Sequence, residues 1–505
     1  MAWLRGRLTL IARDVHTPYS GMLPGYVAGR YTRDECHVDL APLAAFAGAR
    51  LIHAAADGVD TASKRVLLAG GRPPVAYDIL SIDVGITPAF GGIRGAQEHA
   101  TAVKPIDGFC ARWDAIRSAA ERAAKEAEEE GAGRVFAVTV VGGGAGGLEL
   151  ALAMHAALRR VLPQGRLSVR CVTRGEVLGS HNARVRAIFR RIARERASEG
   201  FELRERSGVE AVLDGTVRLQ GGEELRHDAC VWCTQAKAAA WLGESGLATD
   251  GAGFVAVKPT LESTSHTGIF AAGDCANVIA HPRPKAGVFA VRQGMPLADN
   301  LRRASLGQPL KPFTPQQSFM GLIATGDGYA VLSKGSLAME GAWCWRLKDY
   351  IDRAWMDKYN KLPEMKQPLP EAPAAAVAAG ADALAAIRAV PMRCGGCGAK
   401  VGATVLSRVI SRLPQQAQRP EVLVGLNAPD DAAVVRVPDG CVTVQTVDFF
   451  RAFVSDTYVF GQVAANHALG DVHAMGATPL SALAVATVPF GLDAKVRCRL
   501  RLLES

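Results

Sequence analysis

The chain has 505 residues, of which 49% are hydrophobic and 21% are charged; this balance is typical of globular proteins and excludes a disordered or fibrous chain. At roughly 150 residues per domain, the length predicts about three domains. No apolar run reaches the roughly 18 residues of a membrane-spanning helix. The N-terminus lacks the apolar core of a signal peptide, and the 11 cysteines are scattered, so we expect a cytoplasmic protein without a disulfide scaffold.

Lysine and arginine exceed aspartate and glutamate by 58 to 49, which gives a formal charge of +9. Such an excess favours anionic partners such as nucleotides. The densest basic segment, residues 184–196, repeats apolar side chains at helical spacing. This pattern favours a half-buried amphipathic helix with a solvated basic face over a nucleic-acid surface. Neither aromatic interleaving nor zinc-finger spacing accompanies it, and we expect no nucleic-acid partner.

The predicted elements of the first half alternate between strands and helices, which indicates an α/β fold. Strands are predicted at residues 7–12, 65–69, 77–85, 134–141 and 168–173, and helices at 116–132 and 148–160. The run at 134–141 is apolar after its arginine except for one threonine, as in a buried parallel strand. With the helix and strand that follow, it forms a βαβ unit.

A glycine cluster lies between that strand and that helix. Gly142, Gly144 and Gly147 form GxGxxG, and the strand before it and the helix after it are the context that a dinucleotide site requires. The first glycine permits a tight turn, the second lets a pyrophosphate approach, and the third lets helix and strand pack closely. Arg174 follows the next strand. Either it accommodates a 2′-phosphate and favours NADP, or it only faces solvent.

Two motifs together, VGGGAGGLELA and GIFAAGDCA (268–276), resemble the two-dinucleotide-binding flavoproteins, and more narrowly the FAD-dependent pyridine nucleotide oxidoreductases close to type II NADH dehydrogenases. The resemblance covers roughly residues 5–360 and implies a Rossmann-like fold, FAD and NAD(P)H. It also implies that Gly273 and Asp274 lie at the flavin, where the Asp274 carboxylate accepts hydrogen bonds from ribityl hydroxyls.

Loops 16–26 and 83–88 resemble flavin-lining loops of the same family. The family's own first GxGxxG, which binds the FAD pyrophosphate, has no counterpart here, so we expect an incomplete pyrophosphate site. Cys230 and Cys233 form a CxxC in a predicted strand, where their side chains point to opposite faces. We expect structural cysteines, and electron flow from NAD(P)H through flavin to an external acceptor.

An Ala/Pro-rich linker is predicted at residues 370–390. It would separate an oxidoreductase at 1–369, with an NAD(P)-binding insert at about 130–250, from a C-terminal segment at 391–505.

The C-terminal segment opens with CGGCGAK, in which Cys397 lies three residues before Lys400. A lysine lowers the pKa of a nearby thiol, and it also pairs with phosphate. Half a zinc site and a plain loop are the alternatives. Further on, Asp431 follows in sequence, Asp448 lies in an otherwise apolar predicted strand, and Asp471 lies in an apolar predicted helix. Carboxylates in apolar settings are costly unless paired or metal-bound. Such a set suits Mg²⁺ with phosphate oxygens; capping or surface aspartates are the alternative.

The motifs CGGCGAK, DDAAV, QTVDFF and FGQVAANHALGDVHAMGA, in this order, resemble selenide, water dikinase (selenophosphate synthetase) over residues 391–505. That family makes selenophosphate, AMP and phosphate from selenide, ATP and water, as homodimers. The resemblance implies catalytic roles for Cys397 and Lys400, magnesium–ATP binding by Asp431, Asp448 and Asp471, and a place in the same site for Asn466. The second half of the family domain has no counterpart, and we expect a fusion protein seen without both of its ends.

Three hypotheses follow. The first is a bifunctional selenium-metabolism protein in which the flavoprotein module supplies a selenium species to the dikinase. The second is an NAD(P)H dehydrogenase with a vestigial tail, whose aromatic and basic segment 341–359 either binds a membrane surface or docks on the flavoprotein. The third is that this chain alone retains flavin weakly and turns over little ATP.

Overall fold

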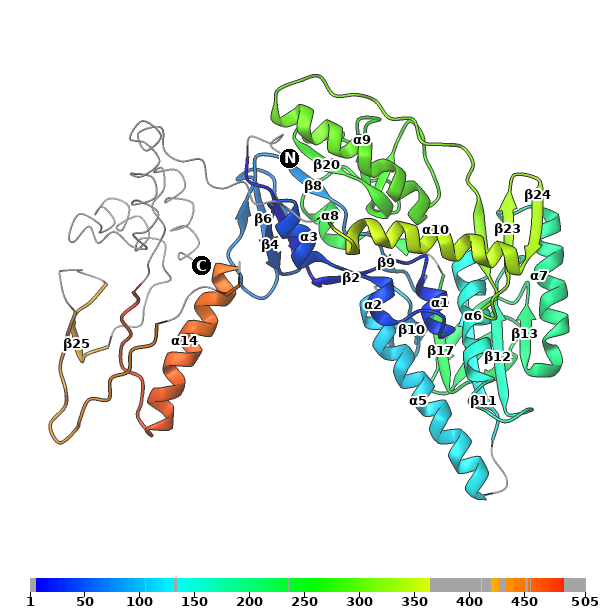
Figure 1. Cartoon of the computed structure of the whole chain (residues 1–505), viewed down its shortest axis with the longest axis horizontal. Coiled ribbons are helices and arrows are strands. Elements are labelled where there is room, and N and C mark those ends of the chain that lie inside the picture. The colour runs from blue at the N-terminus through cyan, green and yellow to red at the C-terminus, as the bar shows by residue number, and fades with distance from the viewer. Residues whose placement is uncertain are drawn as a thin grey trace, which may run out of the picture. The chain divides into compact units, whose positions relative to one another are not determined.

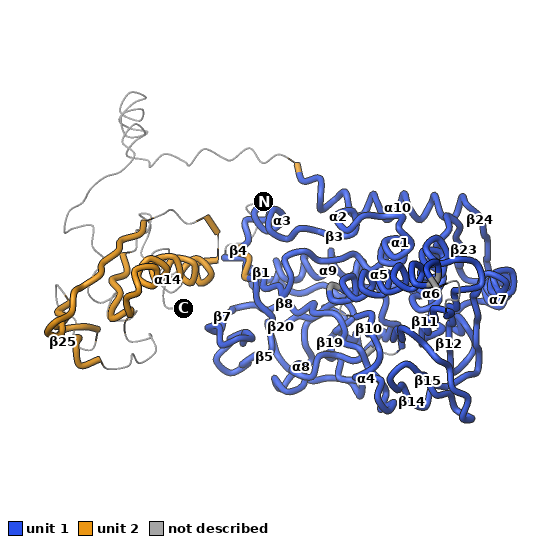
Figure 2. Tube along the Cα trace, turned by 90° about the horizontal axis from the view of Figure 1, so that it is seen from below, with its two compact units in different colours: residues 1–49, 53–362 blue, residues 50–52, 363–505 orange. Residues whose placement is uncertain are grey.

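The structure is a computed structural model. It describes residues 6–104, 106–130, 134–234, 236–363, 410, 419–426, 433–449, 453–454 and 456–485. The chain divides into two units, which Figure 2 shows in different colours. Unit 1 comprises residues 1–49 and 53–362, and unit 2 comprises residues 50–52 and 363–505.

A five-stranded sheet lies toward one end of unit 1 (Figure 1). Its order is β10 (Thr101–Ala102), β17 (Ala229–Trp232), β11 (Phe136–Val141), β12 (Leu167–Val172) and β13 (Phe201–Arg204), and all neighbours are parallel. All six residues of β11 are buried, as expected for a strand covered on both faces. The predicted α/β class and the βαβ unit are confirmed.

Three helices accompany this sheet: α5 (Ile106–Glu130), α6 (Ala145–Leu158) and α7 (Ala183–Glu195). Helix α6 packs against β11 and β12 and has ten buried residues. Helix α5 begins ten residues earlier than the predicted start at residue 116. The extension is explained by Phe109 and Trp113, which are buried in the core that β11 and α6 share.

The basic segment is the amphipathic helix α7. Its apolar face, with Val185, Phe189 and Ile192, is buried. Its arginines are largely engaged in ion pairs, for example Arg190 with Glu205 at 2.7 Å and Arg191 with Glu340 at 2.5 Å. The prediction of a half-buried amphipathic helix is confirmed, and its polar face is matched by carboxylates of the same unit.

The flavin-type motif lies in a second part of unit 1. There β8 (Leu80–Ile82) pairs in parallel with β20 (Ile269–Ala271), and β19 (Val255–Val257) pairs in parallel with β21 (Ala276–Val278). These strands share a hydrophobic core with Leu242 and Leu247, and Leu297 of α9 (Gly287–Ser305) packs against it. Because β8 precedes the five-stranded sheet and β20 follows it, that sheet is inserted between two strands that pair.

The remaining elements of this part of the chain are short. The strands are β1 (Thr9–Ala12), β2 (His16–Pro18), β3 (His37–Asp39), β4 (Arg50–His53), β5 (Ala56–Asp60), β6 (Arg65–Leu68), β7 (Val75–Ala76), β9 (Thr87–Pro88), β14 (Val209–Leu213), β15 (Thr216–Leu219), β16 (Glu224–Arg226) and β18 (Ala236–Lys237). The helices are α1 (Leu23–Val27), α2 (Arg33–Cys36), α3 (Leu40–Phe46), α4 (Ala96–His99), η1 (Ala197–Glu199), α8 (Ala240–Glu244) and η2 (Gly273–Cys275).

Unit 1 ends with the antiparallel sheet β22 (Gly321–Ala324), β23 (Ala330–Lys334) and β24 (Leu337–Gly341), followed by α10 (Ala342–Asn360). Helix α10 contacts all three strands and buries Cys344, Lys348, Asp352 and Met356. The segment at 341–359 therefore docks on the flavoprotein module. Across the described ranges, no helix is long and apolar enough to cross a membrane.

In unit 2 the structure describes β25 (Val422–Val424), β26 (Val434–Val435) and α14 (Thr457–Ala474). Asp471 lies on a helix, as predicted. The strand predicted around Asp448 is wrong, because residues 441–449 adopt no regular structure; their valines are largely exposed and thus lack the packing that stabilises a strand. The predicted linker 370–390 and Cys397, Lys400 and Asp431 lie outside the described residues.

Candidate nucleotide and flavin sites

The glycine turn has the geometry of a dinucleotide site. Gly142 ends β11 with φ +136°, and a Cβ there would lie 3.0 Å from the backbone of Cys233. A Cβ on Gly147 would overlap the Gly142 carbonyl oxygen, so only glycine lets helix and turn approach this closely. Gly144 faces open space at the N-cap of α6 and provides no side-chain cap. The first N–H groups of α6 are thus offered to an anion, which fits a pyrophosphate.

Arg174 follows β12 at the same edge of the sheet and is exposed. It forms no ion pair within the part of the chain that the structure describes. Its neighbour Thr173 lies beside Gly143, where an added Cβ would be 2.5 Å from the threonine side chain. A free guanidinium at this position is compatible with a 2′-phosphate and with simple solvation, so both predicted alternatives stand.

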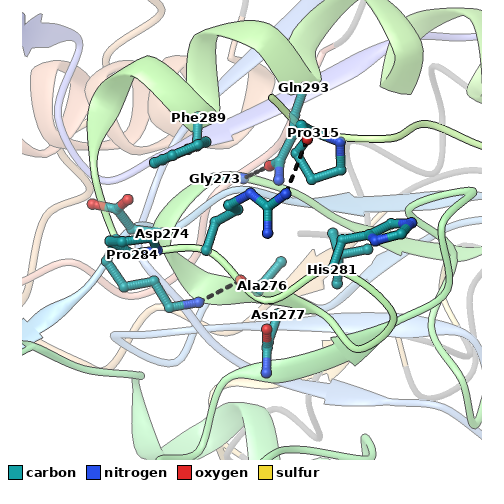
Figure 3. A pocket seen from close by; sticks show the side chains of 12 residues that line it. Gly273, Asp274, Ala276, Asn277, His281, Pro284, Phe289, Gln293 and Pro315 are labelled. Carbon is teal, nitrogen blue, oxygen red and sulfur yellow. Dashed lines mark hydrogen bonds between the residues drawn. The ribbon is translucent and has the colours of Figure 1, made fainter. Parts of the chain in front are cut away.

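Gly273 and Asp274 form the start of η2, directly after β20 and Ala272. The Gly273 N–H donates to Gln293 Oε1 at 2.6 Å, which fixes the backbone against α9 (Figure 3). The Asp274 carboxylate accepts a hydrogen bond from Lys104 Nζ at 3.1 Å. A cavity of about 20 Å³ lies beside Asp274, enough for one water molecule.

Asp83 is a further acidic residue at this position; it opens the loop 83–88 that resembles a flavin-lining loop, but the sequence assigned it no role of its own. It follows β8, the strand next to β20, and a Cβ on Gly273 would overlap its carboxyl oxygen. Burial, and then the charge of Asp274, raise the pKa of Asp83 to about 6. The residue as a whole is exposed to solvent, while one carboxyl oxygen packs against Gly273. The sequence signal that could have identified Asp83 is an acidic residue next to a short apolar strand.

A buried charge network connects α6 to α10. Glu149 lies on α6, two residues after Gly147, and its Oε1 accepts a hydrogen bond from the Ala324 N–H at 2.8 Å. Lys348 Nζ lies 4.0 Å from the same oxygen and donates to Asp352 Oδ2 and to the Gly21 carbonyl, each at 2.8 Å. Burial raises the pKa of Glu149 to about 7, and Lys348 offsets part of that rise. The sequence does not reveal this network, because Glu149 is a single polar residue in a predicted helix and its partners lie far away in the chain.

The CxxC cysteines are not poised for redox exchange. Cys230 is buried in β17, and Cys233, the residue directly after that strand, lies beside Gly142 and Gly147 of the glycine turn. Burial raises the pKa of Cys230 to about 12 and that of Cys233 further still. Because the thiolate is the reactive form, both side chains stay unreactive, which agrees with the prediction of structural cysteines.

In unit 2, hydrogen bonds join α14 to the segment 441–449, and each of them involves one of the predicted magnesium ligands Asp448 and Asp471. His467 Nδ1, on α14, is 2.9 Å from Asp448 Oδ2, and Thr446 Oγ1 donates to Asp471 Oδ2 at 2.8 Å. Asn466 is exposed one turn before Asp471. Among the described residues no three acidic, histidine or cysteine side chains converge as a metal site, and the third predicted ligand lies outside them.

A larger concavity of about 690 Å³ lies at the other edge of the five-stranded sheet, where β11 and β17 begin. Its lining includes Arg112, Arg134, Phe136 and His227. Ligands of parallel α/β sheets bind at the carboxyl ends of the strands, and the glycine turn is at that end. The position of the turn therefore fits a nucleotide better than that of the larger concavity.

With this geometry established, comparison with known proteins identifies the class. Residues 2–294 match the model for pyridine nucleotide-disulphide oxidoreductases. The chain belongs to this family, and the family implies FAD and NAD(P)H as its cofactors.

Solved structures agree at the level of fold. The sulfide:quinone oxidoreductase of Aquifex aeolicus matches with a TM-score of 0.57 and 17% identity, over 70% of this chain and 86% of that one. NDH2 of Plasmodium falciparum, solved with NADH, matches with a TM-score of 0.53 and 13% identity, over 70% of this chain and 94% of that one.

The C-terminal segment matches a second group. Residues 429–500 match the model for the N-terminal domain of AIR synthase related proteins. The selenide, water dikinase of Clostridioides difficile (strain 630) is 47% identical over 95 residues, 19% of this chain and 27% of that protein. That of Desulfitobacterium hafniense (strain Y51) is 50% identical over 95 residues, 19% of this chain and 28% of that protein. The chain thus joins an oxidoreductase domain to a segment similar to selenide, water dikinase and spans under a third of these relatives' length.

Proposed function

We propose that unit 1 oxidises NAD(P)H through a bound flavin and passes the electrons to an external acceptor. The glycine turn carries this proposal, because its three glycines each have the role that a pyridine nucleotide pyrophosphate requires. Gly144 and the start of α6 would bind the pyrophosphate, and Asp274 would accept hydrogen bonds from ribityl hydroxyls. A bound flavin would supply the hydride-accepting chemistry. Burial raises the pKa of Glu149, two residues beyond the turn, to about 7, so this carboxyl is about half protonated near neutral pH.

The test is anaerobic reduction of the flavin-loaded full chain. Addition of NADH or NADPH should bleach the visible flavin absorbance within one turnover, and the faster nucleotide identifies the physiological donor. A chain that binds FAD and is reduced by neither nucleotide would contradict the proposal. A chain that is fully active without any added or retained flavin would do so as well.

For the C-terminal segment we propose a contribution to the magnesium–ATP site of a selenide, water dikinase. Asp431, Asp448 and Asp471 would bind Mg²⁺ with ATP, Asn466 would line the same site, and Cys397 and Lys400 would act on selenide and phosphate. Sequence similarity to the dikinases supports this assignment. The hydrogen bonds that Thr446 and His467 make to Asp471 and Asp448 also support it, because they hold both carboxylates in defined orientations.

Binding of a fluorescent ATP analogue to the full chain, with and without Mg²⁺, tests this second proposal. Asp471→Asn should weaken magnesium-dependent binding at least about tenfold, since a bound divalent ion loses a charged ligand. The matched control is Asp439→Asn, an exposed aspartate in a turn of the same unit. Equal binding by both variants, or binding that is indifferent to Mg²⁺, would leave the oxidoreductase with a vestigial tail as the better description.

We further propose the boundaries 1–369, 370–390 and 391–505, a homodimer formed through the dikinase segment, a cytoplasmic location, and delivery of a selenium species from the first module to the second. Separately expressed modules test the delivery. If they make selenophosphate from a selenium source other than selenide as fast as the fused chain does, the two modules are not coupled.

A further inference from the structure

The loop that follows β12 folds over the glycine turn. The Leu178 N–H donates to the Gly143 carbonyl at 2.7 Å, and an added Cβ on Gly143 would lie 2.5 Å from the Thr173 side chain. In dinucleotide-binding units, the residue that meets the ribose 2′ position follows the strand after the glycine turn, and that strand is β12 here. The loop 173–178 therefore lies where the 2′-hydroxyl of NADH or the 2′-phosphate of NADPH would be recognised.

The segment after the neighbouring strand β13 is joined to this loop by backbone hydrogen bonds. The Ser207 N–H donates to the Thr173 carbonyl at 2.9 Å, and the Arg206 N–H donates to the Gly175 carbonyl at 3.0 Å. Arg206 thus lies beside Gly175, the residue directly after Arg174. Two arginines from distant parts of the sequence therefore belong to adjacent backbone segments at this edge of the sheet.

The segments 173–178 and 204–207 contain two carboxylates, and both are already engaged. Glu205 accepts hydrogen bonds from Arg190 Nε at 2.7 Å, from Arg190 Nη2 at 2.8 Å and from the Val177 N–H at 2.7 Å. Glu176 is shared by three arginines at 3.2 to 3.7 Å, namely Arg206, Arg186 and Arg190. Neither carboxylate is left to bind a ribose 2′-hydroxyl, which is the interaction that an NAD site provides.

The charges of this edge do not balance. The two carboxylates face four guanidinium groups, those of Arg174, Arg186, Arg190 and Arg206. Within the described ranges Arg174 forms no ion pair. Two positive charges thus remain, and a phosphate monoester, with a charge of about −1.5 to −2 at pH 7, offsets them.

Arg206 is the most mobile of these cations. Its side chain is 79% exposed, and its ion pair is with Glu176 at 3.2 Å. Exposed ion pairs contribute little to stability, because water screens them and two long side chains lose conformational freedom. Arg206 can therefore turn from Glu176 to a stronger anion at little cost.

We propose that the nucleotide bound at the glycine turn is NADPH, and that Arg206 is a specificity-determining residue that turns from Glu176 to the 2′-phosphate and binds it together with Arg174. This inference rests on the proposed oxidation of NAD(P)H by unit 1. Only ion pairs are exchanged, and no covalent bond is formed or broken. Glu176 keeps two arginine partners when Arg206 leaves it, so no carboxylate loses its last cation.

Calorimetric titration of the full chain with NADP⁺ and with NAD⁺ measures this selectivity without hydride transfer. The wild type should bind NADP⁺ at least about tenfold more tightly than NAD⁺. Arg206→Met should lose about tenfold in affinity for NADP⁺, because a charge-assisted hydrogen bond is lost, and should bind NAD⁺ unchanged. Glu176→Gln should bind NADP⁺ about threefold more tightly, since the competing ion pair is removed. The matched control is Arg194→Met, an exposed arginine of α7, which should bind both nucleotides as the wild type does.

Equal affinity of the wild type for the two nucleotides would overturn the inference. Equal losses of NADP⁺ affinity in Arg206→Met and Arg194→Met would also overturn it, because they would show a general effect of net charge. In flavin reduction, Arg206→Met should raise the KM for NADPH and leave kcat unchanged, a pattern that a folding defect does not produce.

The flavin-loaded chain separates this inference from the proposed function. Reduction of the flavin by NADH, with no preference for NADPH, would refute the inference and leave the proposed function intact. If neither nucleotide reduces the bound flavin, the proposed function fails and the inference fails with it.

Discussion

Replacing Glu149 with glutamine should stabilise unit 1, and the gain should grow with pH. The Glu149 side chain is 12% exposed, its Oε1 accepts from the Ala324 N–H, and Lys348 Nζ is 4.0 Å away. Its pKa rises from 4.5 to about 7 on folding. A raised pKa means that folding favours the protonated form. That contribution is fully present below pH 4.5 and is lost as the pH rises to about 7.

The difference between the two pKa values, at about 1.4 kcal/mol per pH unit, corresponds to about 3 kcal/mol. Glutamine keeps the acceptor for Ala324 and cannot ionise. Its advantage over wild type should therefore be below about 1 kcal/mol at pH 5 and about 3 kcal/mol at pH 8.

Urea unfolding at the two pH values, followed by tryptophan fluorescence, measures this difference. All seven tryptophans lie within the first 355 residues, so their fluorescence reports on unit 1. Glu98→Gln, an exposed residue on α4, is the control and should change the free energy of unfolding equally at both pH values. The reasoning is refuted if the Glu149→Gln difference is the same at pH 5 and pH 8, or if the variant is less stable than wild type at pH 8.

Three further changes test the same part of the molecule. Lys348→Met should cost about 3–5 kcal/mol in urea unfolding, because it leaves buried carboxylates without their cation, whereas Arg346→Met on the exposed side of α10 should change stability little. Gly147→Ala should slow flavin reduction by NAD(P)H at least about tenfold, because its methyl group forces α6 away from the turn; Gly251→Ala, with open space around it, should not. Arg174→Ala should raise the KM for NADPH and leave that for NADH unchanged if the guanidinium binds a 2′-phosphate. Equal changes in the two KM values would mean that the guanidinium only faces solvent.

What the sequence predicted well is local. The strand, glycine turn and helix at the nucleotide site follow from hydrophobic periodicity and from three glycines within six positions, and neighbouring residues suffice to specify them. For the arginines of α7, the sequence predicted the helix but not the ion pairs. Their spacing indicated the helix, but their carboxylate partners, such as Glu340 for Arg191, come from distant strands.

The residues that sequence reasoning missed depend on contacts between segments far apart in the chain. Glu149 gains its raised pKa from burial beside α10, and the pKa of Asp83 is raised by burial and by Asp274, which follows β20. Neither environment leaves a periodic trace in the sequence. The strand predicted at Asp448 is wrong for a different reason. Its apolar composition indicated a strand, but the described residues around it provide no surface on which those apolar side chains pack.

The pairing of β8 with β20 also constrains how the chain folds during synthesis. About 190 residues separate the two strands, and the five-stranded sheet lies between them. At about 5–20 residues per second, a ribosome needs roughly 10–40 s to supply β20 after β8. During that interval all five strands of the inserted sheet, the last of which ends at Trp232, have been synthesised, so this sheet is free to fold first. The edge that would bind flavin is therefore assembled last, on an inserted sheet that can already be folded.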